Sequence, residues 1–280
     1  MEPASSCTFE GNSDIYGLGV RVGIYLQWLA TLIAKYLHEP AVESTRDANT
    51  AYLVAMLAGL ILITRDAHAE TPALEGYITL LLCFAMACSS CSQAYSAART
   101  RELRSLVDLL LCTAVCAYGL WFLSVGIQRL PRLDCPEVVF FFAPVALFGW
   151  FRIFLQAVFA ASLAASAVLV AMRTSAIYHE LADAVATWGG RAGESSPPPI
   201  HPARVVRASV FQILGGITAV AVFTLVVELT LAWNHARDVY VAATFSQLFP
   251  LVVSTTNLAR VVVQLLKAVV LGDSRVEWTK

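Results

Sequence analysis

Four charged side chains lie inside long apolar stretches of the sequence, and these are Arg21, Arg152, Glu228 and Arg260. In the hydrocarbon region of a membrane, an ionisable group costs at least about 2.5–3.5 kcal/mol, so each one needs a charged partner or water. A carboxyl group in such a place can exchange a proton with a substrate, and a neighbouring guanidinium changes how readily it does so. These four side chains are therefore the first candidates for chemistry.

Glu228 and Arg21 are expected at matching depths. Each lies about five or six residues from the same end of its apolar stretch, which corresponds to roughly 8–9 Å along a helix. We interpret Glu228 as a candidate acid and Arg21 as the residue that sets its environment. Asp14, which precedes the first stretch, is a second candidate acid. A purely structural ion pair between two helices explains the same pattern equally well.

Arg152 and Arg260 each have an amide side chain one helical turn away. Gln156 follows Arg152 and Asn257 precedes Arg260, so each pair shares a helix face. Such a polar stripe could line an ion or substrate path. Hydrogen bonding between helices is the commoner role of Gln and Asn in membrane bundles, and we favour it here. The acids Glu75, Asp108 and Glu137 lie near the ends of apolar stretches, where we expect water to reach them.

The tryptophans among the apolar stretches have two possible roles. Aromatic belts at the two membrane interfaces would account for most of them. Alternatively, their ring faces could line a pocket and stabilise a positively charged intermediate. The aromatic side chains concerned include Tyr25, Phe122 and the Phe residues of 140–154 as well as Trp28, Trp121, Trp150 and Trp233.

The composition indicates where these residues must be positioned. The chain has 280 residues, of which 58% are hydrophobic and 14% charged, whereas soluble domains have about 45–50% and about 25%. An ordinary soluble domain is therefore excluded. The net charge of −1 provides no basic surface for nucleic acid. The expected partner is the lipid bilayer, to which the resemblance described below adds a lipophilic small-molecule substrate, and the sequence leaves the oligomeric state open.

Seven stretches are long and apolar enough to cross a membrane, for which roughly 20 residues are needed. We therefore predict an all-α bundle of seven transmembrane helices, at residues 15–37, 49–64, 73–94, 105–127, 138–172, 208–233 and 245–271. The second is short. The fifth is too long, so we expect it to project from the membrane or to bend near Pro144 and Gly149. Strand-like alternation is absent, which excludes a transmembrane β-barrel.

The distribution of Lys and Arg predicts the orientation. Four lie on one side of the predicted bundle (Arg65, Arg129, Arg132 and Arg237) and twelve on the other (Lys35, Arg46, Arg99, Arg101, Arg104, Arg173, Arg191, Arg204, Arg207, Lys267, Arg275 and Lys280). We expect a lumenal or extracellular N-terminus and a cytosolic C-terminus in a multi-pass protein of an endomembrane or the plasma membrane. The predicted division is a lumenal tail (1–14), spans one to five (15–172), a cytosolic amphipathic helix with a Pro/Gly-rich linker (173–206), spans six and seven (207–272) and a cytosolic tail (273–280).

Two of the seven cysteines lie outside the apolar stretches, at Cys7 and Cys135. Both fall on the predicted lumenal side, where disulfides persist. We predict a disulfide between them that holds the N-terminal tail over the bundle. The other five cysteines lie in the third and fourth stretches, where they behave as small hydrophobic side chains.

Several motifs that would indicate other chemistry are absent. The sequence contains no DDxxD motif for magnesium diphosphate, no HExxH motif and no paired CxxC motifs. It also lacks a phosphate-binding Walker A loop, a GxSxG nucleophile motif and a potassium filter. We therefore expect no metal site and no cofactor.

Four segments resemble a family of fungal multi-span membrane proteins. They are CTFEGNSDIYGLGVRVGIYLQW (7–28), FFFAPVALFGWFR (140–152), VVELTLAWNH (226–235) and SQLFPLVV (246–253). In size and number of spans the chain is also similar to the membrane-bound terpene cyclases of fungal meroterpenoid pathways, of the ascochlorin and macrophorin type. The resemblance covers most of the chain outside the 173–206 segment.

The resemblance implies a metal-independent cyclisation. A carboxylic acid would protonate an epoxide or olefin at the end of a prenyl chain, the chain would close through carbocations, and a base would remove the last proton. Glu228 is the first choice for the acid and Asp14 the second, with Arg21 positioning the carboxyl group. Trp28, Trp121, Trp150, Trp233 and Arg152 would line the substrate site.

Two other classes of function fit the same residues. A channel or transporter would use the buried charges along a polar route that crosses the bundle, with Arg152 and Arg260 facing it. A structural or sensing membrane protein would pair all of these charges and leave no cavity. A terpene cyclase instead requires a pocket near Glu228 that is lined with aromatic rings.

Overall fold

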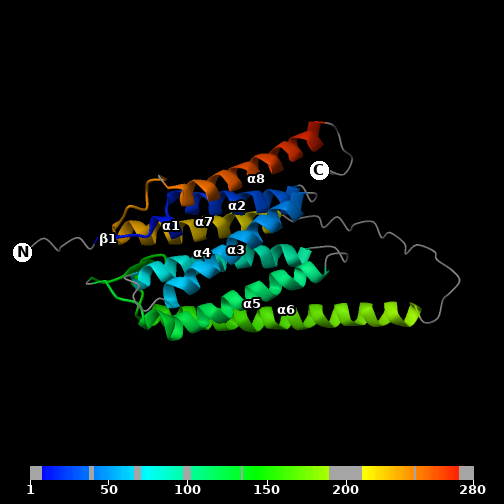
Figure 1. Ribbon diagram of the computed structural model, residues 1–280, viewed down its shortest axis with the longest axis horizontal. Helices are drawn as coiled ribbons and strands as arrows, with labels where there is room; N and C mark the ends of the chain where they lie inside the picture. Colours follow the sequence, from blue (N-terminus) through cyan, green and yellow to red (C-terminus); the bar gives the residue numbers. More distant parts are fainter. Residues whose placement is uncertain are drawn as a thin grey trace, which may run out of the picture.

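Seven long helices run side by side in a bundle, alternating in direction along the chain (Figure 1). The computed structural model describes residues 8–37, 41–65, 71–96, 102–133, 135–188, 210–242 and 244–270. Within these ranges, seven helices are long and apolar enough to cross a membrane. The expected all-α architecture is confirmed. Residues 189–206 of the predicted linker and the tail 273–280 lie outside the described residues.

The long helices are α2 (Leu18–Leu37), α3 (Val42–Arg65), α4 (Ala73–Ser96), α5 (Glu102–Ser124), α6 (Trp150–Trp188), α7 (Val210–Trp233) and α8 (Phe245–Val270). Short elements gather at the end of the bundle where α2 begins. They are β1 (Phe9–Glu10), α1 (Ser13–Tyr16), η3 (Gly126–Gln128), β2 (Val138–Phe140), β3 (Pro144–Ala146) and β4 (Ala236–Arg237).

Two helix boundaries differ from the prediction. The second span begins at Val42 rather than at 49, because the polar residues Thr45, Arg46 and Asn49 are buried against neighbouring helices instead of forming a loop. The predicted fifth span, 138–172, is not one helix. Its first part forms the antiparallel β2–β3 hairpin, in which Val138 pairs with Ala146.

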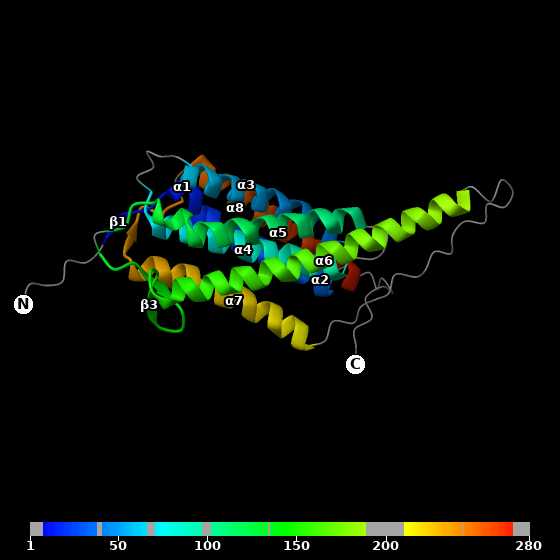
Figure 2. The same ribbon diagram turned by 90° about the horizontal axis from the view of Figure 1, so that it is seen from below.

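Helix α6 begins only after Gly149 and continues through 39 residues to Trp188. At 1.5 Å per residue it is about 58 Å long, and it projects beyond the other helices (Figure 2). The projection and the bend are alternative expectations for this segment; the structure shows a helix that projects, and a hairpin rather than a bend at Pro144 and Gly149. Phe142, between the two strands of the hairpin, has a φ of 59°, a conformation that a helix does not allow.

Helix α4 forms the centre of the bundle, and α7 and α8 form its outer side. In α4, 78% of an apolar segment of 18 residues is buried inside the protein, compared with 11% of the corresponding segments of α7 and α8. Helices α2 and α8 approach closely through Gly19 and Gly23, one turn apart on α2. A Cβ atom at Gly19 would lie 2.4 Å from the backbone oxygen of Gln247, so a larger residue does not fit. Small residues at this spacing are typical of packed membrane helices.

The N-terminal segment crosses the end of the bundle and joins the loop between α7 and α8. Strand β1 pairs in parallel with β4, placing Phe9 opposite Ala236 and Glu10 opposite Arg237. The side chain of Asn12 then caps α1 by accepting a hydrogen bond from the backbone N–H of Asp14, at 3.1 Å. This arrangement fixes the start of α2, and with it the position of Arg21.

Candidate functional site

Arg21 and Glu228 form an ion pair with two hydrogen bonds. Arg21 lies in the first turn of α2 and is completely buried. Its Nε donates to Oε1 of Glu228 at 2.7 Å, and its Nη2 donates to Oε2 at 3.2 Å. Two parallel bonds of this kind fix both the position and the orientation of a carboxylate. The structure thus brings together the two residues that matched in predicted depth.

Backbone carbonyl groups bind the remaining side of the Arg21 guanidinium. Its Nη1 donates to the carbonyl oxygen of Tyr16 at 2.6 Å and to that of Val239 at 3.2 Å. The ring of Tyr240 lies 5.5 Å from the guanidinium carbon, within range of a cation–π interaction. Nη1 of Arg21 therefore keeps its acceptors whatever the state of Glu228, whereas Nε and Nη2 bind only Glu228 among the described contacts.

Glu228 differs from its partner in that water or lipid can reach it. Its side chain is 34% exposed, whereas that of Arg21 is 0% exposed. The hydroxyl group of Tyr25 donates to Oε1 of Glu228 at 2.9 Å. The sequence predicts Tyr25 only as an aromatic ring of its span and not as a partner of Glu228, although it lies four residues after Arg21 and therefore on the same face of α2. Glu228 accepts three hydrogen bonds and still presents an open edge.

Aromatic rings continue from Tyr25 along the interface of α2, α4 and α7. The ring centroids of Tyr25 and Trp28 are 5.6 Å apart, and those of Trp28 and Phe223 are 6.2 Å apart. Phe84 of α4 lies 6.4 Å from Phe223. Of the four predicted tryptophans, Trp28 is the one with a recorded ring contact to a residue that binds Glu228.

A second carboxyl group, that of Glu75, is buried nearby. Glu75 lies in the first turn of α4 and is 2% exposed, so the expectation that water solvates it is wrong. Its Oε1 accepts a hydrogen bond from the backbone N–H of Asn12 at 3.2 Å, and the Tyr16 hydroxyl also interacts with the carboxyl group. Among the described residues, Oε2 has no hydrogen bond within normal geometry. The same N–H of Asn12 also donates to the Tyr16 hydroxyl at 3.2 Å. Nothing in the sequence distinguishes Glu75 from a solvated acid, because its burial depends on the crossing N-terminal segment.

We refer to Arg21, Glu228, Tyr25, Tyr16 and Glu75 together as the Arg21 cluster. It joins α1, α2, α4 and α7 at the end of the bundle where α2 begins. The cluster contains one guanidinium, two carboxyl groups and two phenols, which are groups that can donate, accept and relay protons. One carboxyl group is partly exposed and paired, and the other is enclosed.

Asp14, the second predicted acid, is positioned elsewhere. It is exposed at the start of α1, and its Oδ1 accepts hydrogen bonds from Thr244 Oγ1 at 3.2 Å and Ser246 Oγ at 2.5 Å. Among the described contacts, it therefore connects α1 to the start of α8 and does not bind Arg21 or Glu228.

Arg152 and Arg260 do not meet. Arg152 donates to the backbone oxygens of Leu123 at 2.5 Å and Ser124 at 2.8 Å, and Gln156 donates to the same oxygen of Leu123 at 3.0 Å. These bonds satisfy carbonyl groups at the end of α5, which have no partner within the helix. Arg260 is exposed on α8. Asn257 donates to Gln27 Oε1 at 2.9 Å, a hydrogen bond between α8 and α2.

The other predicted tryptophans contact residues of the end loops. Trp121 lies 5.7 Å from the guanidinium of Arg129. Trp150 is 59% exposed and packs beside Phe141, and Trp233 packs 5.5 Å from Phe140. These positions are typical of an aromatic belt at a membrane interface.

Cys135 lies before β2 and is disulfide-bonded. Cys7 lies outside the described residues, so the Cys7–Cys135 pairing stays a prediction. The five cysteines of the third and fourth spans are free thiols on α4 and α5, namely Cys83, Cys88, Cys91, Cys112 and Cys116.

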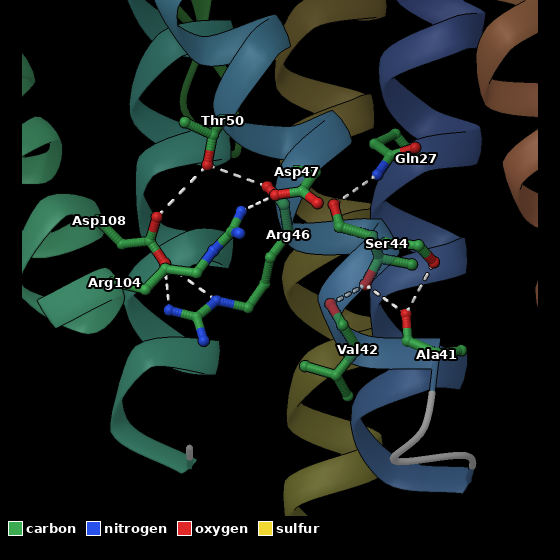
Figure 3. Close-up of polar contacts among 10 residues, drawn as sticks. Gln27, Ala41, Val42, Ser44, Arg46, Asp47, Thr50, Arg104 and Asp108 are labelled. Atoms are coloured by element: carbon green, nitrogen blue, oxygen red, sulfur yellow. Dashed lines mark hydrogen bonds and ion pairs between the residues drawn. The ribbon is translucent and has the colours of Figure 1, made fainter. Parts of the chain in front are cut away.

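A second ion pair, between Arg46 and Asp108, is buried between α3 and α5 (Figure 3). Asp108 Oδ2 accepts from Arg46 Nε at 3.0 Å and from Nη2 at 2.5 Å. The prediction placed Arg46 in a loop and Asp108 in water, and both expectations are wrong. Each is 2% exposed or less. Their neighbouring polar residues lower the local hydropathy, and the sequence alone does not reveal that the two charges neutralise each other.

No group of three or more His, Cys, Asp or Glu side chains in the described part of the chain is arranged to hold a metal ion. Comparison of the chain with protein-family models, curated proteins and solved structures found no significant match.

Proposed function

We propose that the protein crosses a membrane seven times, with its N-terminus on the lumenal or extracellular side and its C-terminus in the cytosol. The seven long apolar helices support the insertion. So do the large apolar side chains exposed on the outer helices, such as Phe211 and Leu214 of α7. The excess of Lys and Arg at the ends that would face the cytosol supports the orientation. An endomembrane or the plasma membrane fits equally.

We further propose that the Arg21 cluster is an acid–base site for a lipophilic substrate, and that the reaction is the cyclisation of a prenyl chain in a meroterpenoid. The main support for this proposal is that the two residues of the Arg21–Glu228 ion pair differ in exposure, although both lie in apolar helices. Arg21 is fully enclosed, while Glu228 presents an edge on a helix that otherwise faces outward. A substrate dissolved in the bilayer can therefore approach the carboxyl group directly.

In this reaction the protein supplies and removes protons, and the bond changes take place within the substrate. A protonated carboxyl group gives its proton to the oxygen of a terminal epoxide, the C–O bond breaks, and the electron pairs of the double bonds form new C–C bonds in turn. A carboxylate then removes a proton from carbon, which forms the final double bond and returns the proton to the protein. Tyr25 contacts Glu228, and the rings of Trp28 and Phe223 follow Tyr25 along the helix interface; in this proposal these rings stabilise the intermediate cations.

The site contains two carboxyl groups, Glu228 and Glu75, so one can act as the acid and the other as the base of the proposed reaction. Glu228 is held by Arg21 and Tyr25, which fix its orientation toward the substrate. Oε2 of Glu75 has no hydrogen bond among the described residues, and Glu75 is connected to the pair through Asn12 and Tyr16. We assign Glu228 as the carboxyl group that contacts the substrate and Glu75 as the second carboxyl group of the site.

Transport or a purely structural role receives less support. A conduction path would require Arg152 and Arg260 to face a common route, whereas Arg152 binds backbone carbonyls of α5 and Arg260 is exposed on α8. A structural role would explain the Arg21–Glu228 pair. A structural role does not explain why Glu228 is partly exposed or why Oε2 of Glu75 has no hydrogen bond among the described residues.

The experiment expresses the full chain in a heterologous host and supplies an epoxyfarnesyl-phenol. We expect a cyclised product of unchanged mass, detected by chromatography and mass spectrometry. Glu228→Gln should lower its formation at least about 100-fold, because loss of a general acid or base typically has an effect of this size. Asp14→Asn is the matched control and should retain activity. Unchanged turnover in Glu228→Gln would exclude this residue as the acid, and ion or solute flux without any cyclised product would favour transport.

A further inference from the structure

A second polar cluster lies where α3 and α5 begin, at the opposite end of the bundle from the Arg21 cluster. It contains two Arg–Asp pairs, Arg46 with Asp108 and Arg104 with Asp47. Figure 3 shows the two guanidinium groups close together between the helices. The Thr50 hydroxyl donates to the backbone oxygen of Arg46 at 2.9 Å and lies 3.3 Å from Asp108 Oδ1, so this carboxylate oxygen can accept more hydrogen bonds. We refer to these five residues as the Arg46 cluster.

Both arginines of the Arg46 cluster keep a buried donor that is unpaired among the described residues. These donors are Nη1 of Arg46 and Nε of Arg104. In Figure 3, Nη1 of Arg46 points away from Asp108, toward the end of the bundle. Buried polar atoms in native proteins are nearly always paired, so we expect the Nε of Arg104, which lines the neighbouring cavity, to gain a partner in the occupied protein.

A cavity of about 350 Å³ opens beside this cluster. It is lined by Thr50, Leu103, Arg104, Val107 and Asp108. Leu103 is 72% exposed and Val107 45% exposed, and Leu110 continues the same apolar strip one turn further along α5. The cavity therefore combines the cationic side chain of Arg104, the anionic side chain of Asp108 and an apolar wall that continues along α5.

We propose that this cavity binds the zwitterionic headgroup of a phospholipid. Its phosphate would accept from Arg104, its ammonium would donate to Asp108, and an acyl chain would follow Leu103, Val107 and Leu110. The charge of Asp108 favours a zwitterionic over an anionic lipid. An anionic headgroup has no ammonium group to pair with Asp108, so its negative charge would be repelled by the carboxylate. This inference rests on the proposed membrane insertion and is independent of the chemistry proposed for the Arg21 cluster.

The test uses the full chain, purified in detergent and freed of lipid. Native mass spectrometry then measures binding of added dioleoylphosphatidylethanolamine, dioleoylphosphatidylglycerol and the free headgroup phosphoethanolamine. We expect one tightly bound phosphatidylethanolamine per chain and weaker binding of the other two. Arg104→Gln should weaken its binding about tenfold, the effect of losing a charged hydrogen bond. Val107→Trp should reduce binding by filling the cavity.

Arg65→Gln is the matched control, because Arg65 is an exposed arginine at the far end of α3. It should bind the lipid as the unchanged protein does. Equal binding of phosphatidylethanolamine by the unchanged protein, Arg104→Gln and Val107→Trp would overturn the site. Equal affinity for phosphatidylglycerol would overturn its assignment to a zwitterion, and equal affinity for phosphoethanolamine would show that no lipid chain is recognised. Cyclisation activity is read out separately, so failure here leaves the proposal for Glu228 intact.

Discussion

Arg21 and Glu228 are 207 positions apart in the sequence, yet their side chains share two hydrogen bonds, of 2.7 and 3.2 Å. Arg21 is enclosed and retains two carbonyl acceptors, whereas Glu228 is partly open. The pair therefore fixes α2 against α7, and it holds a carboxyl group at a surface that is otherwise apolar.

The coupling within this pair can be measured with a double-mutant cycle. Arg21→Gln and Glu228→Gln should each destabilise the protein by about 2 kcal/mol, because each leaves a poorly compensated charge. The double variant should lose less than the sum, by about 1–3 kcal/mol, since both charges are then removed. Thermal unfolding in detergent measures all four proteins. Additive effects within about 0.3 kcal/mol would contradict a direct coupling.

The Arg46 cluster allows a buried and an exposed ion pair to be compared. Asp108→Asn should destabilise the protein by about 3–5 kcal/mol, because Asp108 is 2% exposed and Arg46 would lose its countercharge. Asp47→Asn should change stability by less than about 1 kcal/mol, because the side chains of Asp47 and Arg104 are 62% and 40% exposed. Chemical denaturation of both variants provides the comparison, and similar losses in the two would contradict it.

Close packing of α5 against α6 depends on Gly119. A Cβ atom there would lie 2.3 Å from Cε1 of Phe159, so Gly119→Ala should force the helices apart and destabilise the protein by about 1–3 kcal/mol. Gly59→Ala is the matched control. It lies within α3 with nothing within 4 Å of the added atom, and better helix propensity should make it neutral or stabilising by up to about 1 kcal/mol. A stable Gly119→Ala variant would contradict this packing.

Glu137, in the segment between α5 and α6, should make stability depend on pH. Burial raises the pKa of its carboxyl group above the ordinary value of 4.5, while the Leu133 N–H and Arg132 partly oppose the shift. The folded protein therefore binds the proton more tightly than the unfolded chain does. Stability should fall as the pH rises from about 4.5 through the folded-state pKa, by at most about 1.4 kcal/mol per pH unit.

Glu137→Gln should remove that decline and be more stable than the unchanged protein at neutral pH. Its amide oxygen can still accept from the backbone N–H of Leu133, which binds Oε1 at 3.1 Å in the unchanged protein. Unfolding curves between pH 4 and 8 make the comparison, with the exposed Glu10 replaced by Gln as the control. The same pH dependence in Glu137→Gln would assign the decline to other groups.

The sequence predicts depth along a helix more readily than the direction of a side chain. Arg21 and Glu228 could be matched because each residue advances a helix by a fixed 1.5 Å. Glu75 could not be recognised as their neighbour, because its burial requires Asn12 to cross the end of the bundle. Tyr25 could have been found from its spacing of four residues from Arg21.

Hydropathy does not predict helix boundaries correctly where buried polar residues neutralise one another or where an apolar segment forms a hairpin. Arg46 gives the start of α3 the composition of a loop, yet its bonds to Asp108 allow the helix to begin at Val42. Conversely, residues 138–149 are apolar enough for a helix and instead form a hairpin. Pro144 and Gly149 signal that break, because proline removes a backbone donor and glycine weakens a helix.

The pairing of β1 with β4 has a consequence for the order of assembly. Glu10 lies opposite Arg237, more than two hundred residues later in the chain. At the usual rate of synthesis, roughly ten seconds or more separate the appearance of the two strands. The guanidinium of Arg21 on α2 must wait for α7 to supply its carboxylate. On the proposed membrane insertion, a chain arrested before α7 would hold this charge in an apolar helix without its partner.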